Sequence, residues 1–285
     1  MYKLDSRGLQ QDPVIVIVGV GGTGAFVAEG VCRILGNKNA TMVLVDHDRV
    51  EPHNLRRQAF YADDIGEFKA KLVAERLSRQ FGREVGYTVY PYTRELHYDV
   101  FMRRRSFPSN GLIIGCVDNP AARQAMTESV EDQWWIDAGN GEHSGQVLIG
   151  NTKVSDNLRG AFVESQELCA ALPLPTIQSP DLLAPVPHVE ETLDCAEAVE
   201  AGDQSATINQ AMAGLTVDYV YRLLSGTLPW MGTYLDMQLG AMRPIQAEPA
   251  AVARMTGRTK KFLTERVARP TNGSGRCADC GRYHW

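Results

Sequence analysis

Residues 14–24 have the sequence VIVIVGVGGTG, an unbroken β-branched run that ends in a glycine-rich loop. The run Val14–Val18 is typical of a strand that is buried on both faces of a parallel sheet. Glycines allow a tight turn and a close backbone approach to a ligand. A helix that begins directly after them offers free N–H groups and a positive dipole to phosphate. We therefore predict a nucleotide-binding unit of strand, turn and helix.

On either side of this loop the chain alternates between apolar runs and helical patterns. The expected strands are Thr41–Val45, Gly86–Tyr90, Gly111–Cys116, Trp134–Asp137 and Gln146–Ile149, and the expected helices are Ala25–Leu35, Gly66–Phe81 and Asn119–Val130. This alternation predicts an α/β fold with a Rossmann-like, doubly wound, mostly parallel sheet and helices on both faces.

The pattern changes beyond about residue 160. Prolines are dense between Cys169 and His188, which indicates a long irregular connection of the kind that is usually functional or disordered. A long helix, Gln204–Leu224, and C-terminal antiparallel strands within Thr233–Pro244 follow. We expect one domain over residues 1–246, with a crossover loop at about residues 160–203. Residues 247–285 are expected to form a polar C-terminal extension with a CxxC tail.

The composition bears on several classes of protein. Hydrophobic residues make up 44% and charged residues 22% of the 285 residues, as in ordinary soluble globular proteins. The net charge of −5 lacks the basic bias of a general nucleic-acid binder. No stretch is long and apolar enough to span a bilayer, and Met1–Asp12 lacks the apolar core of a signal peptide. We expect a cytoplasmic protein that binds neither nucleic acid nor membrane, whose cysteines are thiols or metal ligands.

The segment after the second strand bears on the identity of the nucleotide. Asp46 ends that strand, where its carboxylate suits ribose hydroxyls. Residues 46–58 have the sequence DHDRVEPHNLRRQ, and Lys69 follows in the next predicted helix. A dehydrogenase needs no such cluster of Asn and Arg, because the helix N-terminus already neutralises its pyrophosphate. ATP carries more charge and needs cationic groups and a metal, so the cluster favours ATP over NAD.

Asp118 lies in the segment Gly115–Arg123, at the C-terminal end of a buried strand. Open α/β sheets place their ligands at such ends. One interpretation is that Asp118 caps the following helix. The other is that it binds Mg²⁺, a cation that prefers carboxylate and phosphate oxygens.

Together, these motifs resemble the ThiF/MoeB/ubiquitin-activating superfamily of adenylyltransferases. The resemblance covers about residues 14–245 and includes the GxGGxG loop, residues 46–58, the Gly-x-x-Lys at 66–69 and the Cys-x-Asp-Asn at 116–119. It implies that Gly19, Gly21, Gly22 and Gly24 line the phosphates, that Asp46 holds the ribose, that Asn54, Arg57 and Lys69 contact the phosphates, and that Asp118 binds Mg²⁺. Asp48 and Asn119 belong to the same motifs and complete the expected nucleotide site.

The resemblance also implies a reaction. The C-terminal carboxylate of a small ubiquitin-like or sulfur-carrier-like protein would attack the α-phosphate of ATP and release pyrophosphate. That step needs no protein nucleophile, because positioning and charge neutralisation promote it. Relatives tend to be dimers in which an N-terminal arginine of one subunit reaches the partner's ATP. We therefore expect a homodimer, with Arg7 as the candidate arginine. The short length and the C-terminal ending also resemble the ThiF-family member of the bacterial ParB-related, ThiF-related cassette.

Cys195 lies at the end of the proline-rich connection. Relatives that pass the acyl group to a thiol place the nucleophile in such a region, and a flexible loop suits a group that must swing toward the adenylate. The acidic neighbours of Cys195 argue against a lowered thiol pKa. Cys169 is the second candidate nucleophile, and the alternative is a loop thiol without a chemical role.

Cys277 and Cys280 form a CxxC pair followed by His284, a spacing that suits half of a tetrahedral Zn²⁺ site. Many relatives carry a second CxxC pair before the crossover, whereas Cys169 stands alone here. Cys169, Cys195 or His284 would complete the zinc site, and a Cys195 bound to zinc could not act as a free nucleophile. The alternative is a C-terminal tail with two ordinary thiols.

Two other functions stay open at this point. An NAD(P)-dependent oxidoreductase would share the glycine loop and Asp46, but it leaves Asn54, Arg57, Lys69 and Asp118 without a common purpose. The second alternative hypothesis is a non-catalytic nucleotide-binding scaffold. Relatives that act as regulatory halves usually lose the arginine, lysine or aspartate, and all three are present here.

Overall fold

The computed structural model describes residues 1–101, 111–184 and 206–265. The strands are β1 (Lys3–Leu4), β2 (Val14–Val18), β3 (Thr41–Val45), β4 (Gly86–Thr88), β5 (Gly111–Gly115), β6 (Trp134–Asn140), β7 (Ser144–Gly150), β8 (Phe162–Val163), β9 (Leu168–Cys169), β10 (Trp230–Asp236) and β11 (Ala241–Gln246). The helices are α1 (Gly22–Leu35), α2 (Lys69–Phe81), α3 (Arg94–Phe101), α4 (Pro120–Ser129), α5 (Pro175–Gln178), α7 (Ala206–Leu224), α8 (Pro249–Thr256) and α9 (Lys260–Thr264).

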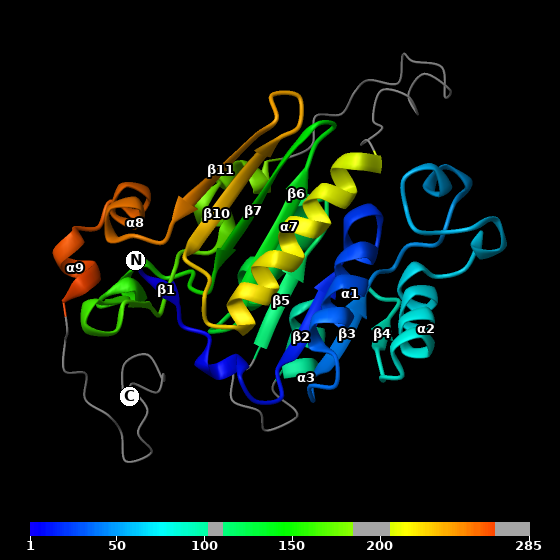
Figure 1. Ribbon diagram of the computed structural model, residues 1–285, viewed down its shortest axis with the longest axis horizontal. Helices are drawn as coiled ribbons and strands as arrows, with labels where there is room; N and C mark the ends of the chain where they lie inside the picture. The colour runs from blue at the N-terminus through cyan, green and yellow to red at the C-terminus, as the bar shows by residue number, and fades with distance from the viewer. Residues whose placement is uncertain (102–110, 185–205, 266–285) are drawn as a thin grey trace.

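Eight strands form the central sheet, in the order β11-β10-β7-β6-β5-β2-β3-β4 (Figure 1). The strands from β4 to β6 in this order are parallel to one another. β7, β10 and β11 extend the sheet as antiparallel strands. The predicted mostly parallel, Rossmann-like sheet with C-terminal antiparallel strands is therefore confirmed.

Helices cover both faces of the parallel strands, because successive side chains of a strand point to opposite faces. Ile15 and Ile17 of β2 belong to the core formed with α1, α2 and α7. Val14 and Val16 of the same strand pack in a second core with Met126 of α4. Figure 1 shows α1 and α7 next to each other over the first of these faces. None of the helices in the described ranges is long and apolar enough to cross a membrane.

The C-terminal part of the described chain differs from the sequence prediction. Residues 247–265, expected to belong to a polar C-terminal extension, form α8 and α9. Val252 of α8 and Leu263 of α9 are fully buried in the main core. Each of these short helices has one fully buried side chain. A helix with a single buried position shows little apolar periodicity in its sequence.

The first half of the expected crossover loop is also more ordered than predicted. β8 and β9 pair with each other, and β9 pairs in parallel with the N-terminal β1, which gives a separate three-stranded sheet. Strands of two residues have no detectable alternation, so the sequence offered no sign of them. Residues 185–203 of the expected loop lie outside the described residues.

Candidate functional site

The carboxyl ends of β2, β3 and β5 line one cleft with a volume of about 930 Å³. The cleft lies where the chain changes direction in the sheet, since β3 and β5 flank β2 on opposite sides. Ligands of open α/β sheets bind at this kind of switch point. The cleft brings together most of the predicted nucleotide residues, namely Gly19, Gly21, Gly22, Asp46, Asp48, Asn54, Arg57, Lys69, Asp118 and Asn119.

The glycine loop has little room for side chains. Gly19 has a φ of 85°, and a Cβ there would lie 2.5 Å from the carbonyl oxygen of Cys116. A Cβ on Gly24 would lie 1.8 Å from the carbonyl oxygen of Gly19, and one on Gly22 would lie 2.3 Å from Nδ2 of Asn209. A Cβ on Gly21 would meet nothing nearer than Gln58, at 3.6 Å. The loop therefore packs tightly on its inner side and presents the start of α1 to the cleft.

Asp46 is fixed at both carboxylate oxygens. Its Oδ2 accepts a hydrogen bond from the backbone N–H of Val20 at 2.6 Å. Its Oδ1 accepts one from the backbone N–H of Asp48 at 2.8 Å. Burial raises the pKa of Asp46, while these two donors and the charge of Lys69 oppose the rise. The remaining lone pairs of a carboxylate held this way suit a pair of ribose hydroxyls.

Lys69 is the first residue of α2 and is only 6% exposed. A lysine is seldom so buried unless it is paired. Its Nζ lies 3.1 Å from Oδ2 of Asp48, and its backbone N–H donates to the carbonyl oxygen of Asp48. The loop after β3 thus holds an ammonium group at the wall of the cleft.

Asn54 and Arg57 lie at the 3-10 helix Pro52–Arg56 and directly after it. The Oδ1 of Asn54 accepts a hydrogen bond from the backbone N–H of Glu51 at 3.0 Å, so this side chain also shapes the loop. The backbone carbonyl of Arg57 accepts a hydrogen bond from Asn209 at 3.4 Å. Both residues line the cleft.

The alternative role considered for Asp118, capping the next helix, is wrong. Asn119 is the cap of α4, and its Oδ1 accepts a hydrogen bond from the backbone N–H of Ala122 at 2.7 Å. Asp118 is exposed and lines the cleft. Its carboxylate therefore faces the space that a nucleotide would fill.

Among the described residues, one group of three side chains has metal-ligand atoms within 4.8 Å of one another: Asp46, His47 and Asp48. Lys69 contacts Asp48 in this group, which disfavours a cation there. Asp118 is not part of it. The Mg²⁺ role of Asp118 stays a prediction. Cys277, Cys280 and His284, the expected zinc ligands, lie outside the described residues.

The two candidate nucleophiles have different outcomes. Cys195 lies outside the described residues. Cys169 is fully buried in β9, where its Sγ donates a hydrogen bond to the carbonyl oxygen of Ala171 at 3.4 Å. Burial raises the pKa of the Cys169 thiol well above its ordinary value. The structure therefore argues against Cys169 as a nucleophile or as a zinc ligand.

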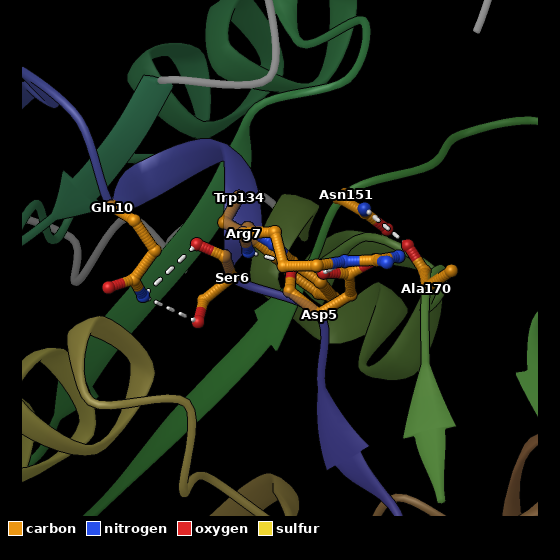
Figure 2. Close-up of polar contacts among 7 residues, drawn as sticks. All are labelled: Asp5, Ser6, Arg7, Gln10, Trp134, Asn151 and Ala170. Carbon is orange, nitrogen blue, oxygen red and sulfur yellow. Dashed lines mark hydrogen bonds and ion pairs between the residues drawn. The ribbon is translucent and has the colours of Figure 1, made fainter. Parts of the chain in front are cut away.

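Arg7 lies near the amino end of β6, whereas the cleft lies at the carboxyl ends of the parallel strands. Its Nε and Nη2 donate hydrogen bonds to Oδ1 and Oδ2 of Asp5 at 2.9 and 2.6 Å (Figure 2). The carbonyl oxygen of Asp5 accepts a hydrogen bond from Nε1 of Trp134, at the start of β6, whereas Asn140, at the end of β6, lines the cleft. Arg7 does not reach its own cleft, and a contribution to a partner subunit stays a prediction.

Several polar residues at the cleft were not given a role from the sequence. Arg123 of α4 forms a buried ion pair with Asp137 of β6. Asn140 donates a hydrogen bond from Nδ2 to Oδ1 of the fully buried Asn209 at 2.9 Å, and Gln146 lines the same part of the cleft. A charged residue within the apolar strand Trp134–Asn140 was the one available sign of this site.

Comparisons with known proteins agree with the fold. A family model described as the ThiF family matches residues 9–259. Ubiquitin-like modifier-activating enzyme 5 of Rattus norvegicus is 29% identical over 241 residues, which cover 79% of this chain and 53% of that protein. The protein of the same name from Caenorhabditis briggsae is 32% identical over 189 residues, which cover 58% of this chain and 43% of that protein. The chain thus spans about half the length of the curated relatives it matches.

Solved structures share the architecture at low sequence identity. The crystal structure of PaaA superposes with a TM-score of 0.57 at 18% identity, covering 84% of this chain and 65% of that chain. E. coli MccB with ATP gives a TM-score of 0.53 at 15% identity, covering 85% and 65%. The family model spans every strand of the central sheet and every residue described at the cleft. This chain belongs to the ThiF family.

Proposed function

We propose that this protein uses ATP and Mg²⁺ to adenylate the C-terminal carboxylate of a small ubiquitin-like or sulfur-carrier-like protein, with release of pyrophosphate. The observation that carries the proposal is the meeting of the glycine loop, Asp46, Arg57, Lys69 and Asp118 in one cleft. The names of the relatives support it, since one is a ubiquitin-like modifier-activating enzyme and another was solved with ATP.

The cleft fits the parts of ATP in order. The start of α1, which the glycine loop leaves open to the cleft, suits the phosphates, because helix N-termini bind anions. Asp46, on the next strand, is fixed so that its free lone pairs can accept from the ribose. Arg57 and Lys69 add the positive charge that a departing pyrophosphate needs. A dinucleotide such as NAD has no group that would use all of these residues.

Asp118 is the residue that would hold Mg²⁺, together with phosphate oxygens. It offers an exposed carboxylate beside the glycine loop, and hard cations prefer such oxygen ligands. When bound, the cation would supply charge neutralisation at the phosphates.

The residues of the chain then position the reaction. The substrate carboxylate forms a bond to the α-phosphorus, and the bond between that phosphorus and the bridging oxygen of pyrophosphate breaks. Asp46 fixes the ribose and so the α-phosphate, while Arg57 and Lys69 hold the leaving group in line. No proton moves in this step, so no side chain needs to act as an acid or a base.

We also propose that, in a second step, the thiolate of Cys195 attacks the acyl carbon of the adenylate, so that a thioester forms and AMP leaves. We further propose that the protein works as a homodimer. The family resemblance supports both proposals. A thioester to Cys195 would appear as a thiol-sensitive adduct with the carrier protein that the Cys195→Ser variant lacks. Sedimentation equilibrium of the purified chain measures its oligomeric state, and a monomer at micromolar concentration would exclude a role for Arg7 in the partner's cleft.

The first test is calorimetric titration with ATP in the presence of Mg²⁺ and, separately, with NAD⁺. We expect binding of ATP and none of NAD⁺. The Asp118→Ala variant should bind ATP·Mg²⁺ about tenfold more weakly, equivalent to ~1.4 kcal/mol. The matched control is Asp63→Ala, which removes an exposed carboxylate outside the cleft. A preference for NAD⁺ would contradict the proposal. Binding of neither nucleotide would favour a non-catalytic scaffold.

A further inference from the structure

The cleft extends beyond the nucleotide motifs over strands β6 and β7. Gly139 and Asn140 of β6, Gln146 of β7 and Arg123 of α4 line this second arm. β6 is two strands away from β2, with β5 between them. At ~4.8 Å per strand, the arm begins about 10 Å from the strand that carries the glycine loop.

Arg123 is built into this arm as a fixed cation. It is 7% exposed, and its Nε lies 3.3 and 3.2 Å from Oδ1 and Oδ2 of Asp137, which is fully buried. A buried charge is stable only when it is paired, so Asp137 holds the guanidinium in place. The pairing uses Nε alone. Within the described parts of the chain, no hydrogen bond joins Nη1 or Nη2 of Arg123 to another residue.

Gly139 allows two N–H donors to lie close to the backbone of β6. A Cβ on residue 139 would lie 3.2 Å from Nη2 of Arg123 and 2.8 Å from Nε2 of Gln146. A guanidinium nitrogen and a side-chain amide therefore border the same point above the glycine backbone. Paired N–H donors of this kind match a planar carboxylate, which arginine binds most effectively.

We propose that Arg123, held by Asp137, binds the terminal carboxylate of the substrate protein next to the α-phosphate of ATP. The inference rests on the proposed function and names a substrate-binding residue for it. A carboxylate that approaches ATP is repelled by the phosphates, and a fixed cation offsets that repulsion. The nucleotide already has its own cations, Arg57 and Lys69, from the segments that follow β3.

The sheet also offers a path for a polypeptide that ends at Arg123. Gln146 pairs with Tyr234 of β10, and Tyr234 pairs with Arg243 of β11. Residues directly opposite each other in neighbouring strands point to the same face of a sheet. Tyr234 is 41% exposed and Arg243 is exposed. An extended C-terminal tail lying over Gln146 and Tyr234 would bring its carboxylate to Arg123, which favours a protein terminus over a small acid.

The bond changes are those of the proposed adenylation. One oxygen of the bound carboxylate attacks the α-phosphorus, the bond to pyrophosphate breaks, and the electron pair leaves with pyrophosphate. Arg123 stays protonated throughout and touches the oxygen that does not attack. It is therefore a substrate-binding residue that contacts the reacting group.

The test uses the full-length protein saturated with α,β-methylene-ATP and Mg²⁺. Calorimetry compares a synthetic peptide that ends in Gly-Gly with a free carboxylate and the same peptide as a C-terminal amide. We expect the wild type to prefer the carboxylate by about tenfold or more, equivalent to ~1.4 kcal/mol. Arg123→Lys should lose that preference, because a lysine cannot reproduce the planar fork. Binding of the ATP analogue should stay unchanged.

Two further variants keep the result interpretable. Gln146→Ala leaves the buried ion pair intact and should weaken the carboxylate preference in part, even if Arg123→Lys does not fold. Arg79→Lys changes an exposed arginine of α2 away from the cleft and should have no effect. A wild type without carboxylate preference, or a preference that both variants keep, would overturn the inference and leave the proposed function standing. Loss of binding of the ATP analogue in Arg123→Lys would indicate that Arg123 binds the nucleotide instead. Failure of the wild type to bind the analogue would count against the proposed function itself.

Discussion

At the scale of single residues, the burial of Asp137 makes the stability of the protein depend on pH. Burial raises its pKa to about 6, while the charge and hydrogen bond of Arg123 oppose the rise. The ordinary value is 3.8. Because the folded state binds this proton more tightly than the unfolded state, the stabilising contribution is present below about pH 4. It is lost as the pH rises through about 6.

We therefore expect the free energy of unfolding of the wild type to rise relative to Asp137→Asn as the pH falls from about 7 to about 4.5. The gain should be on the order of 1–3 kcal/mol, from 1.36 kcal/mol per pKa unit. Urea unfolding of both proteins at several pH values measures the difference, and the other carboxylates cancel because both proteins share them. A difference that is constant with pH would mean that Asp137 has an ordinary pKa.

Two helical glycines should respond in opposite ways to alanine. A Cβ on Gly24 in α1 would lie 1.8 Å from the carbonyl oxygen of Gly19, whereas nothing lies within 4 Å of one on Gly214 in α7. Gly214→Ala should stabilise the protein by about 0.5–1 kcal/mol, because alanine is the better helix former. Gly24→Ala should destabilise it by more than about 2 kcal/mol, since the backbone must move.

Thermal unfolding of the two glycine variants, in the absence of nucleotide, tests this prediction. Equal effects in the two helices would show that the glycine loop is not as tightly packed as its geometry indicates. A stable Gly24→Ala variant that fails to bind ATP·Mg²⁺ would instead separate the role of this glycine in the fold from its role in the phosphate site.

At the scale of elements, α7 supports the candidate site through Asn209. Its Oδ1 accepts hydrogen bonds from Thr23 of α1 and from Asn140 of β6, at 3.4 and 2.9 Å. Its Nδ2 donates to the backbone carbonyl of Arg57 at 3.4 Å. One buried amide thus joins three segments that line the cleft.

Asn209→Ala should therefore destabilise the protein by about 1–3 kcal/mol, because it leaves buried polar partners unsatisfied. It should also weaken ATP·Mg²⁺ binding, since the glycine loop and Arg57 lose a common anchor. The control is Gln210→Ala, which changes the next residue of the same helix at an exposed position. Chemical unfolding and calorimetry measure the two effects. Unchanged nucleotide affinity in Asn209→Ala would limit this residue to a structural role.

The elements also show what sequence patterns can and cannot predict. Val14–Val18 and Thr41–Val45 were predicted to the residue, because short continuous runs rich in β-branched and other apolar residues mark buried parallel strands. β1 and β9 were missed, because strands of two residues carry no alternation. The cap of α4 could not be assigned between Asp118 and Asn119 from sequence, since both residue types cap helices and only geometry separates them.

The candidate site also contains residues that sequence patterns can locate and residues that they cannot. The glycine loop, Asp46, Lys69 and Asp118 lie in short motifs after strands, so their place at the cleft could be located from sequence. Residues that support the site from distant segments, such as Asn209 and the Arg123–Asp137 pair, could not. Their partners are set by how α7, α4 and β6 pack together, and no local pattern encodes that packing.

At the scale of the whole molecule, α8 and α9 connect the end of the described chain to its core. Val252 and Leu263 are fully buried, and Arg258 donates a hydrogen bond to Asp156 at 2.6 Å. The backbone N–H of Gly160 donates to the carbonyl oxygen of Phe262 at 3.0 Å. These contacts lie away from the nucleotide cleft, beside the small sheet of β1, β9 and β8. They should affect stability rather than catalysis.

A chain that ends after Gln246 should therefore be less stable than one that ends after Glu265. Burial of a Val or Leu side chain contributes about 1.5–3 kcal/mol, so the loss should reach about 3–6 kcal/mol. That is a large share of the ~5–15 kcal/mol available to a typical protein. Urea unfolding of the two truncated proteins measures the difference, and ATP·Mg²⁺ affinity should be the same wherever the shorter protein is folded. Equal stabilities would mean that residues 247–265 are an appendage. A shorter chain that folds but no longer binds ATP would mean that these helices also support the cleft.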